Sequence, residues 1–126
     1  MTLVTIMQRH MLKSKIHRAT ITEADLNYEG SLTIDKELLD AVDLQPYERV
    51  MVYNINNGER FDTYAIEGKA GSGVIGLNGA AARKGLIGDQ IIIVSYAYFT
   101  AEDLIAYEPK IVLLNKSNKI KKWLHK

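Results

Sequence analysis

The feature that most constrains the fold is a pair of alternating runs around Asn56-Asn57-Gly58-Glu59. In both runs, residues 49–55 and 60–66, β-branched and aromatic side chains alternate with polar ones, as in a half-buried strand. Asn-Gly between two such runs favours a tight turn because both residues tolerate positive φ. The sequence therefore predicts an antiparallel hairpin at this point.

Further strands are expected on both sides of the hairpin. Residues 15–22 and 32–34 precede it, and residues 110–114 form a short apolar run after it. Residues 90–99 are the longest apolar run, which predicts a central strand buried on both faces. Many short strands separated by turns indicate a compact, mainly β fold, a β-barrel with small helices.

Short helices are expected where capping residues precede helical patterns. Asp35 is a predicted N-cap for residues 36–42, and Thr100 with Asp103 matches a capping box before another short helix. Residues 79–84 predict a small-residue turn or a single helical turn.

The remaining segments are predicted to be connections. Residues 23–29 form a polar link, and residues 115–126 form a lysine-rich tail whose charge is expected to be solvated. Residues 71–76 match the letters of a dinucleotide fingerprint, Gly-x-Gly-x-x-Gly. Because they lie between two predicted strands, with no helix after them, a connecting loop is the better interpretation.

Composition excludes several function classes. The 126 residues predict a single domain, and a net charge of +1 gives no long-range field to attract nucleic acid or a membrane surface. Without cysteine there are no disulfides or thiolate metal sites, and the three histidines have no acidic cluster beside them, so no metal is expected. The segment 1–6 is too short for a signal-peptide core. These observations predict a soluble, cytoplasmic protein.

One Gly-Ser pair has unusual flanks. Gly30-Ser31 alone would be an ordinary turn former. It lies, however, within a series of four blocks, which are Lys15-Ile16-His17-Arg18, residues 24–31, residues 60–66 and Asn78-Gly79-Ala80-Ala81-Ala82. In this order and spacing the blocks, which span most of residues 7–95, resemble the pyruvoyl-dependent aspartate 1-decarboxylase family.

The resemblance implies a fold, an activity and a self-made cofactor. The family fold is a double-psi β-barrel with short helices, and the reaction converts L-aspartate to β-alanine and CO₂ for pantothenate synthesis. It also implies that the Ser31 hydroxyl attacks the Gly30 carbonyl and that the chain splits into residues 1–30 and 31–126. The second fragment then begins with a pyruvoyl group, which serves as the electron sink. Glycine suits the cleavage site because it has no Cβ and tolerates a strained backbone.

The resemblance gives two neighbouring residues separate roles. Thr63 is expected to stabilise the oxyanion on Gly30 during cleavage, and Tyr64 to return a proton to Cα after CO₂ leaves. Neighbours along a strand point to opposite faces, so the two side chains cannot simply share one site. The resemblance also implies a homotetramer with sites at subunit interfaces, which would resolve this conflict.

Substrate binding is assigned on the same basis. Arg60 and Lys15 are expected to hold the carboxylates of L-aspartate, and which residue holds which carboxylate stays open. Asn78 is suited to orient the pyruvoyl carbonyl, and the small residues after it allow close backbone approach to a ligand; these are Gly79, Ala80 and Ala81. His17 is expected to be a neighbour of the site, with Tyr28 and Tyr53 as lining residues.

A different class of function is also compatible with the sequence. The alternative is a non-catalytic β-barrel binding module that shares the fold and does not process. Residues 1–6 precede Met7, where the family's start falls, and are interpreted as an extension or a misassigned start.

Overall fold

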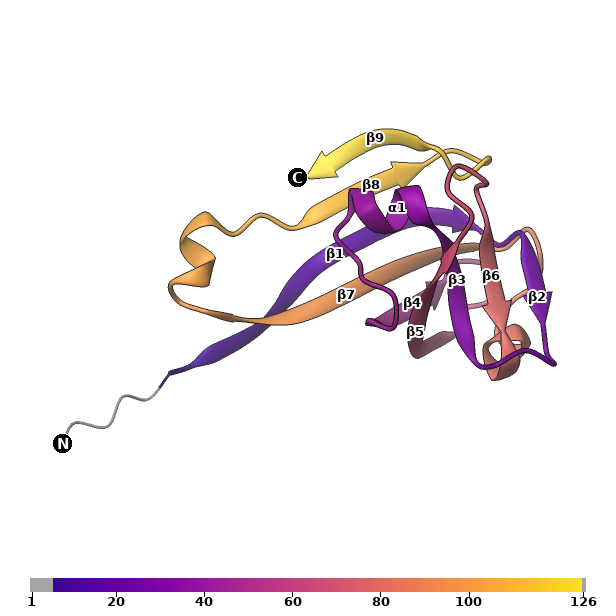
Figure 1. Ribbon diagram of the computed structural model, residues 1–126, viewed down its shortest axis with the longest axis horizontal. Helices are drawn as coiled ribbons and strands as arrows, with labels where there is room; N and C mark the ends of the chain where they lie inside the picture. The colour runs from indigo at the N-terminus through magenta and orange to yellow at the C-terminus, as the bar shows by residue number, and fades with distance from the viewer. Residues whose placement is uncertain (1–5, 126) are drawn as a thin grey trace.

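The computed structural model describes residues 6–125, and its elements are short strands with three brief helical segments (Figure 1). In chain order they are β1 (Gln8–Thr20), β2 (Glu23–Asp25), β3 (Ser31–Asp35), α1 (Lys36–Ala41), β4 (Arg49–Asn54), β5 (Arg60–Gly68), β6 (Ile75–Asn78), η1 (Gly79–Arg83), β7 (Gln90–Thr100), η2 (Asp103–Ala106), β8 (Lys110–Leu114) and β9 (Ile120–His125). Residues 1–6, interpreted above as an extension or a misassigned start, lie outside the described residues except for residue 6.

All the strands join one sheet in the order β2-β6-β3-β5-β4-β7-β1-β8-β9. Most neighbours are antiparallel, but β3 runs parallel to β5, β2 to β6 and β1 to β8. This confirms the mainly β class with short helices, while the double-psi arrangement stays a prediction. In Figure 1 the outer parts of β1 and β7 leave the body of the molecule as a long two-stranded arm.

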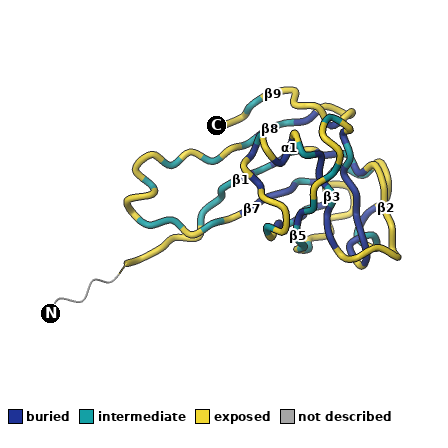
Figure 2. The backbone as a smooth tube through the Cα atoms, viewed as in Figure 1, coloured by how far each residue is buried: buried dark blue, intermediate teal, exposed yellow. Residues whose placement is uncertain are grey.

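The core lies inside the curved sheet, where aliphatic side chains from most strands meet. Ile16, Ile34, Val52 and Ile93 are fully buried, and Leu39 of α1 covers the same core. Figure 2 shows the buried residues concentrated in the body, whereas the arm is exposed or half-buried along its length. The alternation seen in the sequence is what provides each strand with one apolar face.

Several local predictions are confirmed. The strands β4 and β5 form the antiparallel hairpin, and Gly58 in its turn has φ +76°. Asp35 caps α1 by accepting a hydrogen bond from Glu37 N at 2.9 Å. At the start of η2 the Thr100 and Asp103 side chains each accept a hydrogen bond from the other residue's backbone N–H.

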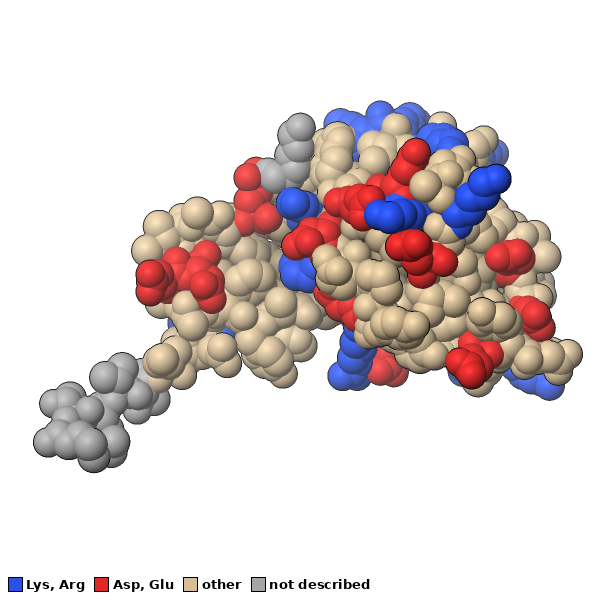
Figure 3. Space-filling model, viewed as in Figure 1, with Lys and Arg blue, Asp and Glu red and all other residues tan. Residues whose placement is uncertain are grey.

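Three predictions about segments are wrong. Residues 120–125 are not a tail, because they form β9, which pairs with β8 and extends the sheet; the lysine side chains at 116, 119, 121 and 122 are exposed, as predicted, and Figure 3 shows Lys and Arg side chains gathered over β9. The predicted link at residues 23–29 contains β2, which pairs with β6. The strand β7 is buried only in its first half, since Tyr98 is 66% exposed. The pairing of β7 with β4 ends at Val94, and beyond it β7 continues on the arm paired with β1.

No helix within residues 6–125 has both the length and the apolar character needed to cross a bilayer.

Asp35 ties three segments together at the end of β3. Its buried carboxylate accepts hydrogen bonds from Glu37 N and Gly71 N at 2.9 Å and from Gly73 N at 2.8 Å. Burial alone would raise the pKa of Asp35, but the backbone N–H groups, that of Gly73 foremost, outweigh it and lower the pKa. The carboxylate therefore stabilises the folded chain in its ionised form.

This interaction predicts a pH-dependent stability. Because the Asp35 pKa is lower in the folded chain, its contribution is present above the ordinary value of 3.8 and is lost as pH falls through the folded-state pKa. We expect Asp35→Asn to destabilise the protein by about 1–3 kcal/mol at pH 7, since an amide cannot accept at both positions. Between about pH 5 and pH 3 the parent's Tm should fall more steeply than the variant's.

Thermal unfolding followed by circular dichroism measures both effects. Asp40→Asn is the matched control, because Asp40 is an exposed carboxylate whose ion pair with Lys36 lies at the surface. Parallel acid profiles for the parent and Asp35→Asn would contradict the assignment.

Candidate active site

Ser31 is the first residue of β3, and its side chain is held from two sides. The residue is 1% exposed, and its hydroxyl donates to Glu29 O at 3.1 Å. From the other side Asn78 Nδ2 donates to Ser31 Oγ at 3.0 Å. The hydroxyl thus points back along the chain, toward the residues that precede Ser31.

Asn78 reaches Ser31 because of strand register. Antiparallel pairing of β3 with β6 sets Ser31 opposite Asn78 and leaves their side chains on the same face. The same Asn78 amide nitrogen also donates to Thr33 Oγ1 at 2.8 Å. With both amide hydrogens engaged, the orientation of the Asn78 side chain is fixed.

Gly79 packs directly against the backbone of Gly30. It has φ +65°, and a Cβ added to it would lie 2.8 Å from Gly30 Cα and Gly30 N. Both the space and the backbone angle therefore demand glycine at position 79. Gly30 shows the reverse: its φ lies outside the left-handed region, and a Cβ there would meet no atom within 4 Å. The backbone strain expected at Gly30 is therefore not found. The residue with a left-handed backbone is Gly79, which contacts Gly30.

The small residues after Gly79 continue as the short helix η1. Ala81 is 8% exposed and joins the core, whereas Ala80 is exposed on the side of the helix away from it.

Tyr64 lies in the same cavity as Ser31. Parallel pairing sets Leu32 of β3 beside Ala65 of β5, so the preceding residues, Ser31 and Tyr64, share the outer face. They line a cavity of about 430 Å³ together with Tyr28, Glu29, Pro46, Tyr47, Ile66 and Glu67. Strand alternation turns Thr63 toward the opposite face, as the sequence predicts, so Thr63 and Tyr64 do not meet in this cavity.

Neither of the two predicted cations lines the Ser31 cavity, although Arg60 begins β5, the strand that carries Tyr64. Arg60 stacks on Tyr53, with Cζ 3.8 Å from the ring centroid. Lys15 is on β1 opposite Val94, and three strands separate β1 from β3 in the sheet order. Within residues 6–125 the lining of the Ser31 cavity contains two carboxylates and neither lysine nor arginine. One chain therefore brings Ser31 and Tyr64 together but does not add the cations to them.

His17 occupies a different cavity, which it lines with Arg18. Desolvation, reinforced by the positive charges of Lys15 and Arg18, lowers the pKa of His17. Tyr28 lines the Ser31 cavity as expected, whereas Tyr53 contacts Arg60 and the hydroxyl of Tyr96. Among the described residues no group of three metal-binding side chains forms.

Sequence reasoning missed Tyr47, which lines the Ser31 cavity from the link between α1 and β4. Its ring centroid is 6.0 Å from that of Tyr64. The available signal was Pro46, which favours the second position of a β-turn and so places the next residue at the tip.

The contact between Gly79 and Gly30 predicts unequal costs for two glycine substitutions. A Cβ at position 58 would meet no other atom within 4 Å, so Gly58→Ala at φ +76° should lower the stability only by the cost of left-handed backbone strain, about 1–2 kcal/mol. Gly79→Ala adds overpacking against Gly30 and should cost about 2–5 kcal/mol in all. Chemical denaturation of both variants measures the difference, and equal losses would show that position 79 is not tightly packed.

Comparison with known proteins gives a consistent result. A family model described as aspartate decarboxylase matches residues 7–121. The aspartate 1-decarboxylase of Desulfotalea psychrophila is 64% identical over 115 residues, which cover 91% of this chain and 97% of that protein. The proteins of the same name from Syntrophobacter fumaroxidans and Ralstonia pickettii are 61% and 59% identical, covering 90% and 91% of this chain and 91% and 96% of the relatives.

Proposed function

This chain belongs to the aspartate decarboxylase family, and on that premise we propose that its Ser31 becomes the pyruvoyl group with which it converts L-aspartate to β-alanine and CO₂. The observation that carries the proposal is the buried Ser31 hydroxyl, held by Glu29 O and Asn78 while the Gly30 backbone lies on Gly79. The family is pyruvoyl-dependent, and its product is used for pantothenate synthesis. A cytoplasmic location suits a chain without cysteine.

Self-cleavage needs a nucleophile placed against the preceding carbonyl. In the proposed reaction Ser31 Oγ attacks the Gly30 carbonyl carbon, the Gly30–Ser31 C–N bond breaks and an ester replaces it. Elimination across Cα–Cβ of Ser31 then releases residues 1–30 with a carboxylate on Gly30 and leaves dehydroalanine at the start of residues 31–126. Hydrolysis of this dehydroalanine releases its nitrogen as ammonia and leaves the pyruvoyl group. The hydrogen bond from Ser31 Oγ to Glu29 O supports this geometry because it folds the hydroxyl back over Gly30. Thr63 is proposed to donate to the Gly30 oxyanion.

The residues around Ser31 suit the group that would replace it. A pyruvoyl carbonyl supplies the electrophile that withdraws electrons from Cα as CO₂ leaves. Asn78 directs one N–H to this position and the other to Thr33 Oγ1, and Gly79, the first of the small residues 79–81, lets the backbone come close to Gly30. Tyr64 is proposed to donate the proton to Cα, since its hydroxyl-bearing ring lines the same cavity.

A second copy of the chain is proposed to supply the cations. L-Aspartate carries two carboxylates, while the Ser31 cavity is lined by Glu29 and Glu67. Arg60 lies at the start of β5, outside the lining of the cavity, and Lys15 lies on β1; from these positions a guanidinium fork and an ammonium can meet a neighbouring chain's cavity. A homotetramer with its sites at subunit interfaces brings the two halves together and lets Thr63 and Tyr64 serve different steps.

The cleavage predicts a specific mass pattern. Denaturing mass spectrometry of the purified protein should show two fragments that separate between Gly30 and Ser31. Ser31→Ala should stay intact and inactive. The chain contains a matched internal control, Gly71–Ser72, which is the same dipeptide in another loop and should not be cut. A single intact chain after long warm incubation would overturn the proposal and favour the non-catalytic binding module.

Tyr64 is tested separately from cleavage. Tyr64→Phe should process normally, because the phenol acts only after the cofactor exists. We expect its kcat to fall by about 10²- to 10⁴-fold, the usual range for a lost general acid. Tyr98→Phe, which removes an exposed hydroxyl on the arm, is the control. Parental kcat in a fully cleaved Tyr64→Phe would remove Tyr64 from the proposed role and leave the decarboxylation intact.

A further inference from the structure

We propose that Tyr47 is a positioning residue for Tyr64, and that a polar cluster around Glu48 holds it in a strained turn for that purpose. The inference rests on the proposed function, in which Tyr64 donates the proton. In this role Tyr47 does not touch the reacting atoms and acts only through Tyr64.

The backbone at Tyr47 is unusual for an aromatic residue. Residues 45–48 form a β-turn that Glu48 N closes by donating to Gln45 O at 3.1 Å, with Pro46 in the second position. Tyr47 occupies the third position with φ +72°, where a type II turn ordinarily has glycine or asparagine. Its side chain is 77% exposed, so burial in the core does not compensate for this strain. A strained residue that the surroundings maintain at a cavity points to a functional constraint.

The turn is fastened to the strand that carries Tyr64. Tyr47 N donates to Ala65 O at 2.7 Å, and Ala65 N donates to Glu48 O at 2.9 Å. These bonds surround the residue next to Tyr64 and bring the two tyrosine rings to a centroid separation of 6.0 Å with an interplanar angle of 31°. The Tyr47 ring therefore limits the directions that the Tyr64 ring can take within the cavity.

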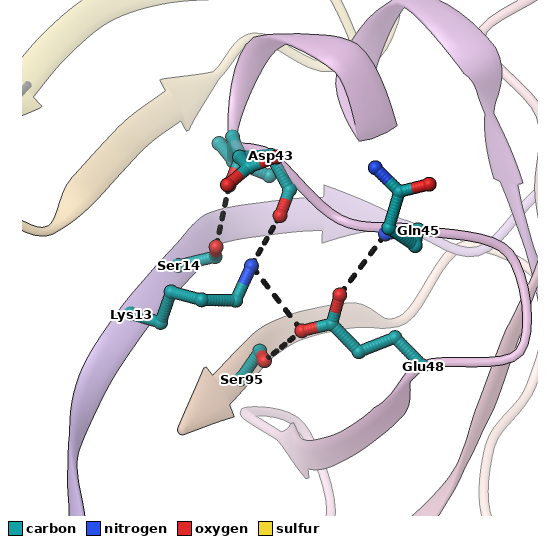
Figure 4. Close-up of polar contacts among 7 residues, drawn as sticks. Lys13, Ser14, Asp43, Gln45, Glu48 and Ser95 are labelled. Carbon is teal, nitrogen blue, oxygen red and sulfur yellow. Dashed lines mark hydrogen bonds and ion pairs between the residues drawn. The ribbon is translucent and has the colours of Figure 1, made fainter. Parts of the chain in front are cut away.

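The turn is also held by the polar cluster around Glu48, which we call the clamp and which consists of Glu48, Gln45, Ser95 and Lys13 (Figure 4). Glu48 Oε1 accepts from Gln45 N at 3.0 Å, while Glu48 Oε2 accepts from Ser95 Oγ at 2.6 Å and pairs with Lys13 at 3.2 Å. Lys13 also donates to Asp43 O. Because Lys13 belongs to β1 and Ser95 to β7, the Glu48 carboxylate anchors the turn to the body of the sheet.

Burial alone would raise the pKa of Glu48, but the hydrogen bonds from Ser95 and Gln45 N, together with Lys13, outweigh it and lower the pKa. The clamp is thus ionised at neutral pH. It compensates for the strain at Tyr47, and the ring is held against Tyr64 without any packing of its own in the core.

The test is Tyr47→Asn, which keeps a side chain that tolerates positive φ and removes the ring. If the turn is strained, the Tm of the variant should equal the parent's or exceed it by about 2–4 °C. Because Tyr64 loses its neighbour, kcat should fall about 10-fold with KM changed less than about twofold. Tyr47→Phe keeps the ring and should retain kcat within about twofold of the parent.

Coupling to Tyr64 is measured with a double-mutant cycle. If Tyr47 acts through Tyr64, Tyr47→Asn should cause no further loss of kcat in the Tyr64→Phe background. Asp43→Asn is the matched control, since Asp43 is also left-handed at φ +58° but lies outside the Ser31 cavity; its kcat should equal the parent's.

The outcomes separate this inference from the proposed function. Parental kcat in Tyr64→Phe would overturn the role of Tyr64, on which the inference rests. A slow Tyr64→Phe with parental kcat in Tyr47→Asn, or with equal losses from Tyr47→Asn in both backgrounds, would overturn the positioning role alone. A Tm several degrees below the parent's in Tyr47→Asn would show that the turn is not strained.

Discussion

The register between β3 and β6 is the constraint on which the candidate site depends. It sets Ser31 opposite Asn78, so that an amide 47 residues away along the chain reaches the serine hydroxyl at 3.0 Å. The next residue, Gly79, then meets the backbone of Gly30 at a distance that leaves no room for a Cβ. A shift by one residue would turn Asn78 to the other face and remove both contacts at once.

Hydrogen bonds at the other end of β3, at Asp35, hold the strand in this register. Asp35 accepts three backbone N–H groups from α1 and from the loop before β6. The side chain of the buried residue Asn118 accepts a hydrogen bond from Thr20 N and donates hydrogen bonds to Thr20 O and Gly73 O. The loop before β6 is therefore held by two side chains from different parts of the chain. Rigid anchoring at one end leaves the strand's other end, at Ser31, as the place where a precise turn can form.

Local signals in the sequence predict local structure well. The turn at Gly58 and the cap at Asp35 follow from backbone preferences of residues within a few positions of each other. The pairing of β9 with β8, and the position of Asn78 beside Ser31, depend on contacts between distant residues that periodicity does not specify. Resemblance to a family, not spacing, supplied the candidate site. The family resemblance did not point to Tyr47, because the proposed role of this side chain is to position Tyr64 and not to contact the reacting atoms.

Backbone strain is distributed unevenly over the described chain. Of the non-glycine residues with positive φ, Asp43 and Asn118 are of types that tolerate it, whereas Arg18 and Tyr47 are not. Tyr47 lines the Ser31 cavity, and Arg18 follows His17 at a register shift in β1, beside the strand segment that carries Lys15. Strained residues and bulges concentrate at functional sites because function, not stability, selects them. The two costly positions therefore lie beside the two groups that we propose a subunit interface brings together, the serine on one surface and the Lys15 cation on the other.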